Sequence, residues 1–341
     1  MSAPVPLSPP ARIASPARIA SPARIRLTLV VVAFVLALGG CAQAPAEGDG
    51  PATFTLRVGM TATNGVVQGN LGWADEQGTL SRALRPVGVE KIEFSFFQAG
   101  TQVQAALLSG AIDVAVSGDM PALTTRANGG KTRLLGFSTI NANTALIGRK
   151  DGPTTIDGLV GKVVTAPHGT IRYRVLYGML QKAGLADDVE IANVPTPEAI
   201  AGLRSGKVDA LTIGGTTAAL LEKQGYVVID DTSRHPELAS TEPNTVLQTF
   251  LDEHPGFAEA WGRGIVETNT HIRENTEKYW TYSADKDDVP VELARAAEPV
   301  EHFNLEPLPK EGVDQLKSTY EFLREQNLLK EPFDIDGWLV R

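Results

Sequence analysis

The chain of 341 residues contains a single cysteine, Cys41, and only 6% of its residues are aromatic. One cysteine cannot form an intramolecular disulfide, so the fold must rest on its hydrophobic core. The five histidines are scattered, and no group of His, Cys and acidic residues has the spacing of metal ligands. A Gly-x-Ser-x-Gly nucleophile elbow and a phosphate loop ending in Gly-Lys-Ser/Thr are also missing. The sequence therefore predicts no catalytic residue, no metal and no cofactor.

Positive charge is also scarce. The chain has 31 Lys and Arg against 40 Asp and Glu, which gives a formal net charge of -9. No basic run with interleaved aromatic residues occurs, and an acidic domain binds nucleic acid poorly. A nucleic-acid partner is therefore not expected.

Residues 1–40 are predicted to be an export signal. A positively charged beginning is followed by an apolar run, Leu27 to Leu38, that is interrupted only by Thr28; the charges are Arg12, Arg18, Arg24 and Arg26. The run has 12 residues, whereas a helix that spans a bilayer needs about 20. The following "LGGC" is similar to the bacterial lipobox, so we expect a lipid on Cys41 and a flexible tether over residues 41–53. This predicts an extracytoplasmic protein anchored to the cell membrane, with a net charge of -13 after cleavage (27 basic minus 40 acidic residues).

The remaining chain alternates between short β-like runs and helical patterns, which predicts an α/β fold with a largely parallel sheet. Strands are expected at 55–60, 92–97, 112–116, 134–138, 144–149, 162–166, 189–194, 208–213 and 226–230. An extended run leads into a helix start over 244–255, and helices are expected near 256–274, 290–298 and 310–328. We interpret the chain as two lobes joined by a hinge, with a cleft between them: residues 54–147 and 246–341 form lobe 1, and residues 148–245 form lobe 2.

An internal repeat supports two duplicated lobes. Residues 107–129 align with residues 203–225 at an offset of 96, and both copies contain Ser-Gly-x-x-Asp. The two aspartates are Asp113 and Asp209. Each copy is expected to form a helix, a glycine cap, a strand, a glycine turn and a second helix.

Four loops are expected to face the cleft, because ligands bind beyond the carboxyl ends of parallel strands, where helix N-termini favour anions. The loops are "MTATNG" (60–65), "SGDMP" (117–121), "APHGT" (166–170) and "IGGTT" (213–217). Together with the helix start after Gly100, they supply the candidate ligand contacts, which are Thr61, Gly100, Thr101, Gln102, Ser117, Gly118, Asp119, His168, Gly169, Thr170, Arg172, Gly214 and Thr216.

Two arginines follow the third loop. With Thr170 as the N-cap, Arg172 falls within the buried stripe of the helix, so its cation is either aimed into the cleft or held by an acid. Arg174 falls on the opposite side and is expected to be a solvated surface charge. His168 is expected to be a loop residue or a ligand contact, because nothing near it supports catalysis.

Two further residues have two interpretations each. Asp119 either caps the helix that contains Pro121 or faces the cleft, where it would favour a ligand with an amine. Trp73 lies in a helical run and belongs either to the core or to a stacking surface for a ligand.

The stretch "LLSGAIDVAVSGDMP" (107–121) resembles the first lobe of ABC-transporter solute-binding proteins of the taurine, aliphatic-sulfonate and nitrate type. "TTIDGLVGKVVTAPHGTIRYRVLYGMLQKAGL" (154–185) looks like the entry to that family's second lobe, and "FLDEHPGFAEAW" (250–261) matches a later landmark. At the family's His position this chain has Arg172, and Gly214-Gly215-Thr216 replaces a frequent Trp-Asp-Pro.

The resemblance implies a monomeric substrate-binding component that delivers a small solute to a permease and an ATPase. The leading hypothesis is a small anion, such as a sulfonate or taurine, bound with the help of Arg172. The alternative is a heterocycle, such as a thiamine-precursor pyrimidine, for which Asp119 and Trp73 would matter more. A biosynthetic enzyme on the same scaffold is a third hypothesis, and export of the chain argues against it.

Overall fold

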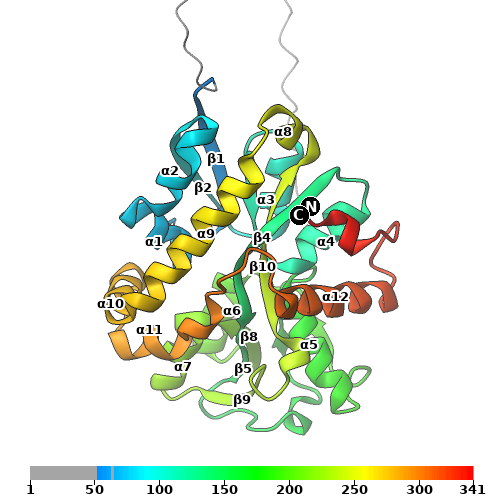
Figure 1. Ribbon diagram of the computed structural model, residues 1–341. Coiled ribbons are helices and arrows are strands. Elements are labelled where there is room, and N and C mark those ends of the chain that lie inside the picture. Colours follow the sequence, from blue (N-terminus) through cyan, green and yellow to red (C-terminus); the bar gives the residue numbers. More distant parts are fainter. Residues whose placement is uncertain (1–51, 63–64, 341) are drawn as a thin grey trace, which may run out of the picture. The chain divides into compact units, whose positions relative to one another are not determined.

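The computed structural model describes residues 52–62 and 65–340, and these contain two mixed β-sheets (Figure 1). The predicted signal peptide, Cys41 and nearly all of the predicted tether lie outside the described residues. Within the described part, no helix is both long and apolar enough to cross a membrane.

The first sheet has the strand order β2-β1-β3-β10-β4. Its strands are β1 (Phe54–Thr61), β2 (Val89–Phe97), β3 (Val114–Val116), β4 (Thr132–Ala142) and β10 (Ser240–Leu247). β1 is parallel to β2 and β3, and β10 is antiparallel to both of its neighbours. The helices between β1 and β4 are α1 (Gly69–Gln77), α2 (Thr79–Leu84), η1 (Arg85–Val87), α3 (Gly100–Leu108) and α4 (Asp119–Ala127).

The second sheet repeats this topology, with the order β7-β6-β8-β5-β9. Its strands are β5 (Thr144–Gly148), β6 (Val164–Thr165), β7 (Ile191–Ala192), β8 (Ala210–Gly214) and β9 (Val227–Asp231), and β5 is the antiparallel strand. The helices of this part are η2 (Asp157–Leu159), α5 (Ile171–Lys182), α6 (Thr196–Ser205), α7 (Gly215–Lys223) and η3 (Pro236–Leu238). The α/β fold predicted from the alternating pattern is confirmed.

The chain changes sheet twice. β4 ends at residue 142 in the first sheet and β5 begins at residue 144 in the second; β9 ends at residue 231 and β10 begins at residue 240 back in the first. These positions lie a few residues before the lobe boundaries expected at 147 and 246. The division into lobes itself stays a prediction, and below "lobe 1" and "lobe 2" mean the elements around the first and second sheet.

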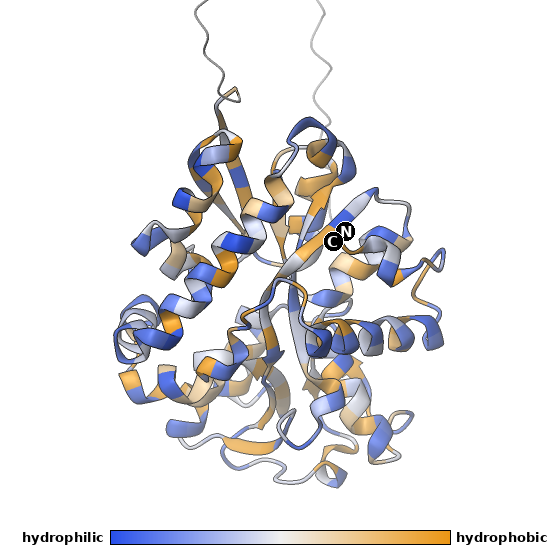
Figure 2. Cartoon of the chain, in the orientation of Figure 1, coloured by the Kyte–Doolittle hydropathy of each residue, from blue (hydrophilic) through white to orange (hydrophobic). Residues whose placement is uncertain are grey.

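The C-terminal part is helical, with α8 (Gln248–Glu253), α9 (Phe257–Glu274), α10 (Thr276–Asp287), α11 (Val291–Ala297), η4 (Val300–His302), α12 (Lys310–Glu325) and α13 (Ile335–Trp338). Helix α10 was not predicted. α9 lies beside α1 and α2, whereas α12 packs against α4 and β10 (Figure 1). Apolar residues concentrate on the strands, and α12 carries many hydrophilic residues (Figure 2).

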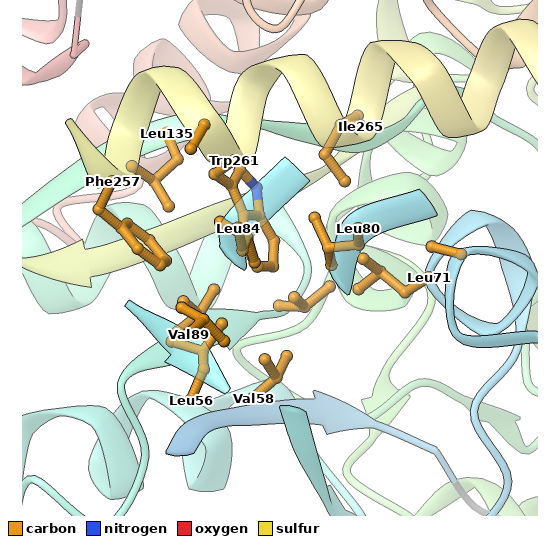
Figure 3. Close-up of a cluster of buried hydrophobic side chains, with 14 of the residues drawn as sticks. Leu56, Val58, Leu71, Leu80, Leu84, Val89, Leu135, Phe257, Trp261 and Ile265 are labelled. Atoms are coloured by element: carbon orange, nitrogen blue, oxygen red, sulfur yellow. The ribbon is translucent and has the colours of Figure 1, made fainter. Parts of the chain in front are cut away.

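The largest cluster of the core joins the first sheet to α9. Phe257 and Trp261 of α9 are fully buried against Leu56 of β1 and Leu84 of α2 (Figure 3). The indole Nε1 of Trp261 donates a 3.1 Å hydrogen bond to Oδ1 of Asn244 in β10. Burial of one such side chain contributes about 2 kcal/mol, so the returning C-terminal segment stabilises the sheet that the N-terminal segment begins.

The two aspartates of the internal repeat have the same structural role. Asp113 accepts hydrogen bonds from the backbone and guanidinium of Arg57, and Asp209 accepts from the guanidinium of Arg149 and the backbone N–H of Val163. Each carboxylate thereby ties the start of its own strand to the neighbouring strand. The two aspartates therefore join strands in the same way in both copies of the repeat, and neither lines the cavity.

Candidate functional site

A cavity of about 920 Å³ lies between the two sheets, where helix N-termini from both lobes meet. The first residues of α1, α3, α5, α6 and α7 line it, together with Gly118, the residue before α4. The backbone N–H groups at a helix start have no partner within the helix, and the helix dipole is positive there. Three helix starts from each lobe therefore create a cavity that favours negative charge.

The cavity brings together most of the candidate residues and leaves four of them outside its lining. Those that line it are Thr61, Gly100, Thr101, Gln102, Gly118, His168, Thr170, Arg172 and Gly214. The four others are Ser117, Asp119, Gly169 and Thr216. For all thirteen candidate residues, the role of ligand contact stays a prediction.

Arg172 is a half-buried cation without a counter-ion. Its Nη1 donates a 2.8 Å hydrogen bond to Oγ1 of Thr196 at the start of α6, and among the described residues no acid forms an ion pair with it. Burial lowers the pKa of the guanidinium, although an arginine of this kind stays charged at neutral pH. Of the two alternatives for Arg172, the structure favours a cation that faces the cavity over one held by an acid.

The expectation for Arg174 was wrong, because this residue is buried and not solvated. Its side chain is 1% exposed, and its guanidinium donates hydrogen bonds to the carbonyls of Glu237 and Leu238 at 2.9 and 3.1 Å and to Oγ of Ser318 at 3.0 Å. Helical phase placed it correctly on the side opposite Arg172. That side, however, packs against η3 and α12, so the helix is covered on two faces.

Asp119 has a structural role away from the cavity. Its carboxylate is fully buried and accepts hydrogen bonds from the backbone of Met120, from Oγ1 of Thr319 and from the backbone of Thr241, at 2.8, 2.8 and 3.4 Å. Burial raises its pKa, and the nearby Arg174 and these hydrogen bonds oppose that shift. Asp119 is thus the first residue of α4 and not its N-cap, which is Gly118, and its carboxylate links the helix start to α12 and β10.

Other candidates also have partners within the protein. Ser117 accepts a 3.0 Å hydrogen bond from Gln104, and Thr216 donates to the carboxylate of Asp287. The ring of His168, which lies at the exposed rim, contacts the carbonyl of Ile191 through Nε2 at 3.0 Å. Its backbone N–H donates to Asn193.

Trp73 belongs to the core. It is 4% exposed and packs edge-on against Tyr279 and Tyr282, and its Nε1 donates to Nδ1 of His271 at 2.9 Å. It does not line the cavity, so it offers no stacking surface there.

The prediction from sequence missed the acidic part of the cavity wall. Glu242 of β10 and Glu298, directly after α11, both line the cavity. Burial, together with the charge of Glu298, raises the pKa of Glu242 to about 7. Burial also raises the pKa of Glu298, although Tyr279 and Ser283 donate hydrogen bonds to its carboxylate at 2.6 and 3.0 Å and oppose the shift. No pattern in the sequence pointed to Glu242, because the burial of Ser240–Leu247 becomes apparent only in the structure.

A second, smaller cavity of about 440 Å³ lies near the point where the chain changes sheet, and Asn141, Asn143 and Thr232 are among its lining residues. It contains none of the candidates. In the described part of the chain, no group of three or more His, Cys, Asp and Glu could hold a metal ion.

Comparison with known proteins finds relatives of the class that the sequence motifs predicted and solved structures with the same fold as this chain. Residues 91–248 match the family described as NMT1/THI5 like. A putative aliphatic sulfonates-binding protein of Bacillus subtilis is 26% identical over 258 residues, which are 74% of this chain and 76% of that protein. The taurine-binding periplasmic protein of Escherichia coli is 22% identical over 178 residues, which are 52% of this chain and 56% of that protein.

Solved structures extend the similarity to most of the chain. The periplasmic aliphatic sulphonate-binding protein SsuA from Escherichia coli superimposes with a TM-score of 0.67 at 21% identity, over 84% of this chain and 97% of that one. The alkanesulfonate-binding protein SsuA from Xanthomonas axonopodis pv. citri, bound to MOPS, gives 0.70 at 20% identity, over 86% and 99%. The desulfurization enzyme DSZB also shares the fold, with a TM-score of 0.64 at 20% identity, over 84% and 96%.

The chain therefore has the fold of the periplasmic binding proteins. The resemblance to ABC-transporter solute-binding proteins of the sulfonate and taurine type, predicted from its motifs, is confirmed by these relatives.

Proposed function

We propose that this protein is the extracytoplasmic substrate-binding component of an ABC importer and that it binds a small anionic solute in the 920 Å³ cavity. The observation that carries the proposal is the guanidinium of Arg172, a half-buried cation in the cavity wall with only the hydroxyl of Thr196 as a partner. A buried charge without a counter-ion is costly, and an anionic ligand supplies that counter-ion.

The helix starts around the cavity support the same ligand charge. Backbone N–H groups of six helix starts converge there, and each contributes favourable interaction with an anion without any side-chain charge. The relatives named above are sulfonate- and taurine-binding proteins, and a sulfonate offers three oxygens to such donors. Arg172 would hold two of these oxygens bidentately.

The direct test is titration calorimetry of the purified protein with ethanesulfonate, taurine and nitrate. Arg172→Ala removes the proposed counter-ion and is expected to weaken binding by about a hundredfold, since a hydrogen bond to a charged group contributes about 1.5–3 kcal/mol and the guanidinium would make two. The matched control is Arg204→Ala, which removes an exposed cation at the end of α6. Failure of every small anion to bind would contradict the proposal, as would equal affinities of the two variants.

Closure of the two lobes around the ligand is part of the proposal. The chain crosses between the sheets at residues 142–144 and 231–240, and two such crossings form a hinge. The closed form would then be presented to the permease and ATPase subunits of the importer, with the binding protein acting as a monomer.

The anchoring lipid on Cys41 is proposed from the "LGGC" motif alone. Cys41→Ser is expected to release the protein from the membrane fraction, and mass spectrometry of the wild-type N-terminal peptide should show the acyl chains. A wild-type peptide with a free cysteine would contradict this anchor.

A catalytic function is less well supported. A desulfurization enzyme shares the fold, but Cys41 is the only cysteine of this chain and it precedes the predicted domain. None of the described residues that line the cavity is a cysteine.

A further inference from the structure

The cavity that is proposed to bind an anion contains more carboxyl groups than guanidinium or ammonium groups. Three carboxyl groups line it, against one guanidinium and two imidazoles; they are Glu198, Glu242, Glu298, Arg172, His168 and His302. Burial lowers the pKa of His302, so its imidazole favours the neutral form. A simple anion would satisfy Arg172 and leave the acids unpaired.

The two glutamates differ in how they are held. Glu298 is fixed by hydrogen bonds from Tyr279 and Ser283. Glu242 has neither a hydrogen bond nor an ion pair to its carboxylate within the described residues, and the charge that acts on it most is the like charge of Glu298. Glu242 is thus a cavity-lining acid whose partner the protein does not supply.

Thr241, the neighbour of Glu242 in β10, is a second polar residue of this wall. It is 2% exposed, lines the same cavity, and its Oγ1 has no hydrogen-bond partner in the described part of the chain. Buried hydroxyl groups are nearly always hydrogen-bonded in folded proteins. The hydroxyl is itself closed to solvent, so the unpaired carboxyl of Glu242 alone marks this wall as a place for a ligand group that can donate hydrogen bonds.

The acidic and basic groups come from different sheets. Arg172 lies on α5, which follows β6 of the second sheet, whereas Glu242 belongs to β10 of the first. A ligand that contacts both has its charges separated along its length. It also joins the two lobes, so its binding free energy stabilises the arrangement in which they are together.

From this arrangement we infer that the ligand is a zwitterion, whose anionic group binds Arg172 and the helix starts, and whose protonated amine binds Glu242 beside Glu298. The inference rests on the proposed function for the anionic half, and it assigns Glu242 and Glu298 as the residues that select an amine. An ammonium group offers three N–H donors to the carboxylates, and its charge removes the repulsion between the two acids.

The test compares two ligands that share a sulfonate and differ at the other end: taurine, with an ammonium group, and isethionate, with a hydroxyl group. Calorimetry with the wild-type protein is expected to show that taurine binds about tenfold or more tightly, because charge-assisted hydrogen bonds are roughly twice as strong as neutral ones. Glu242→Gln is expected to remove most of that preference, because the amide keeps the shape of the side chain and loses its charge.

The matched control is Glu253→Gln, an exposed acid at the end of α8, which should keep the preference of the wild type. A thermal melt of each variant without ligand checks that it is folded, and Glu298→Gln provides a second variant that should reduce the preference for taurine. Equal binding of taurine and isethionate by the wild type would overturn the zwitterion inference and leave the proposed anion site intact. If neither of these ligands binds, and no other small anion binds either, the proposed function itself is contradicted.

Discussion

The carboxylate of Asp287, the last residue of α10, accepts a hydrogen bond from the hydroxyl of Thr216 at the start of α7. Its other oxygen accepts a hydrogen bond from the amide of Gln68, the residue before α1. Gln68 and α10 belong to lobe 1, whereas Thr216 belongs to lobe 2. Asp287 therefore bonds to both lobes at the edge of the cavity.

Replacing Asp287 should weaken the closed arrangement. Asp287→Ala removes two hydrogen bonds, each of which contributes about 1 kcal/mol, and is expected to lower ligand affinity roughly tenfold without touching the ligand. Calorimetry measures the affinity, and small-angle scattering should show a larger radius of gyration for the variant. Asp285→Ala, an exposed acid on the same helix, is the control; a variant at 287 that behaved like it would contradict the role of Asp287 in closure.

Arg174 should be necessary for stability and Arg172 for binding. Arg174→Ala removes the hydrogen bonds to η3 and Ser318 and the positive charge near the buried Asp119. Removal of one partner from such a buried network costs about 3 kcal/mol, which denaturant unfolding can measure. Arg172→Ala should lose less than about 1 kcal/mol of stability, since its only partner in the described residues is Thr196. A larger loss of stability in Arg172→Ala than in Arg174→Ala would contradict this assignment.

Affinity for an amine-bearing ligand should rise with pH. The pKa of Glu242 is raised to about 7 by burial and by Glu298, so its carboxyl is neutral below that pH and negative above it. Between pH 6 and 8, taurine is expected to bind progressively more tightly, and isethionate is not. Glu242→Gln should abolish the rise, and persistence of the rise in that variant would contradict the assignment to Glu242.

The same raised pKa has a consequence for the ligand-free protein. The carboxyl of Glu242 has an ordinary pKa of 4.5 and a pKa of about 7 in the folded protein. At pH values between these two, the folded state binds more protons at Glu242 than the unfolded state, so the free energy of unfolding falls as the pH rises through this window. Glu242→Gln should therefore be more stable than the wild type at pH 8 and differ less at pH 5. Denaturant midpoints at the two pH values would show this, and a variant less stable at pH 8 would refute it.

The aspartates of the repeat should matter equally in the two lobes. Asp113→Asn and Asp209→Asn each weaken the bonds to an arginine and to a backbone N–H of the neighbouring strand. Each is expected to cost about 1–2 kcal/mol of stability and leave ligand affinity within about twofold, since neither lines the cavity. Large losses of affinity at constant stability would place them in the binding site instead.

Local pattern was sufficient for much of the fold. The alternation of strand and helix, the start of α5 after Thr170 and the helix starts that face the cavity were all visible in the sequence, because periodicity and turn residues depend on neighbours in the chain. Arg172 was placed by the same means.

The remainder depended on tertiary contacts. Arg174 was expected to be solvated because a helical wheel cannot show that η3 and α12, from distant parts of the sequence, cover its side of the helix. Glu242 and Glu298 were missed because they reach the cavity from strand β10 and from the end of α11, far along the chain from the four predicted ligand loops. The opposite error occurred at Asp119, whose loop was correctly placed but whose side chain turns to Thr319 and Thr241.

The order of the strands also bears on how the protein is made. The second sheet uses one continuous stretch, from β5 to β9, so all its strands are present in the chain once residue 231 has been added. The first sheet lacks β10, which pairs with both β3 and β4, until residue 247. Because β10 also carries Glu242, the acidic wall of the cavity is assembled only after the lobe that it faces can already be folded.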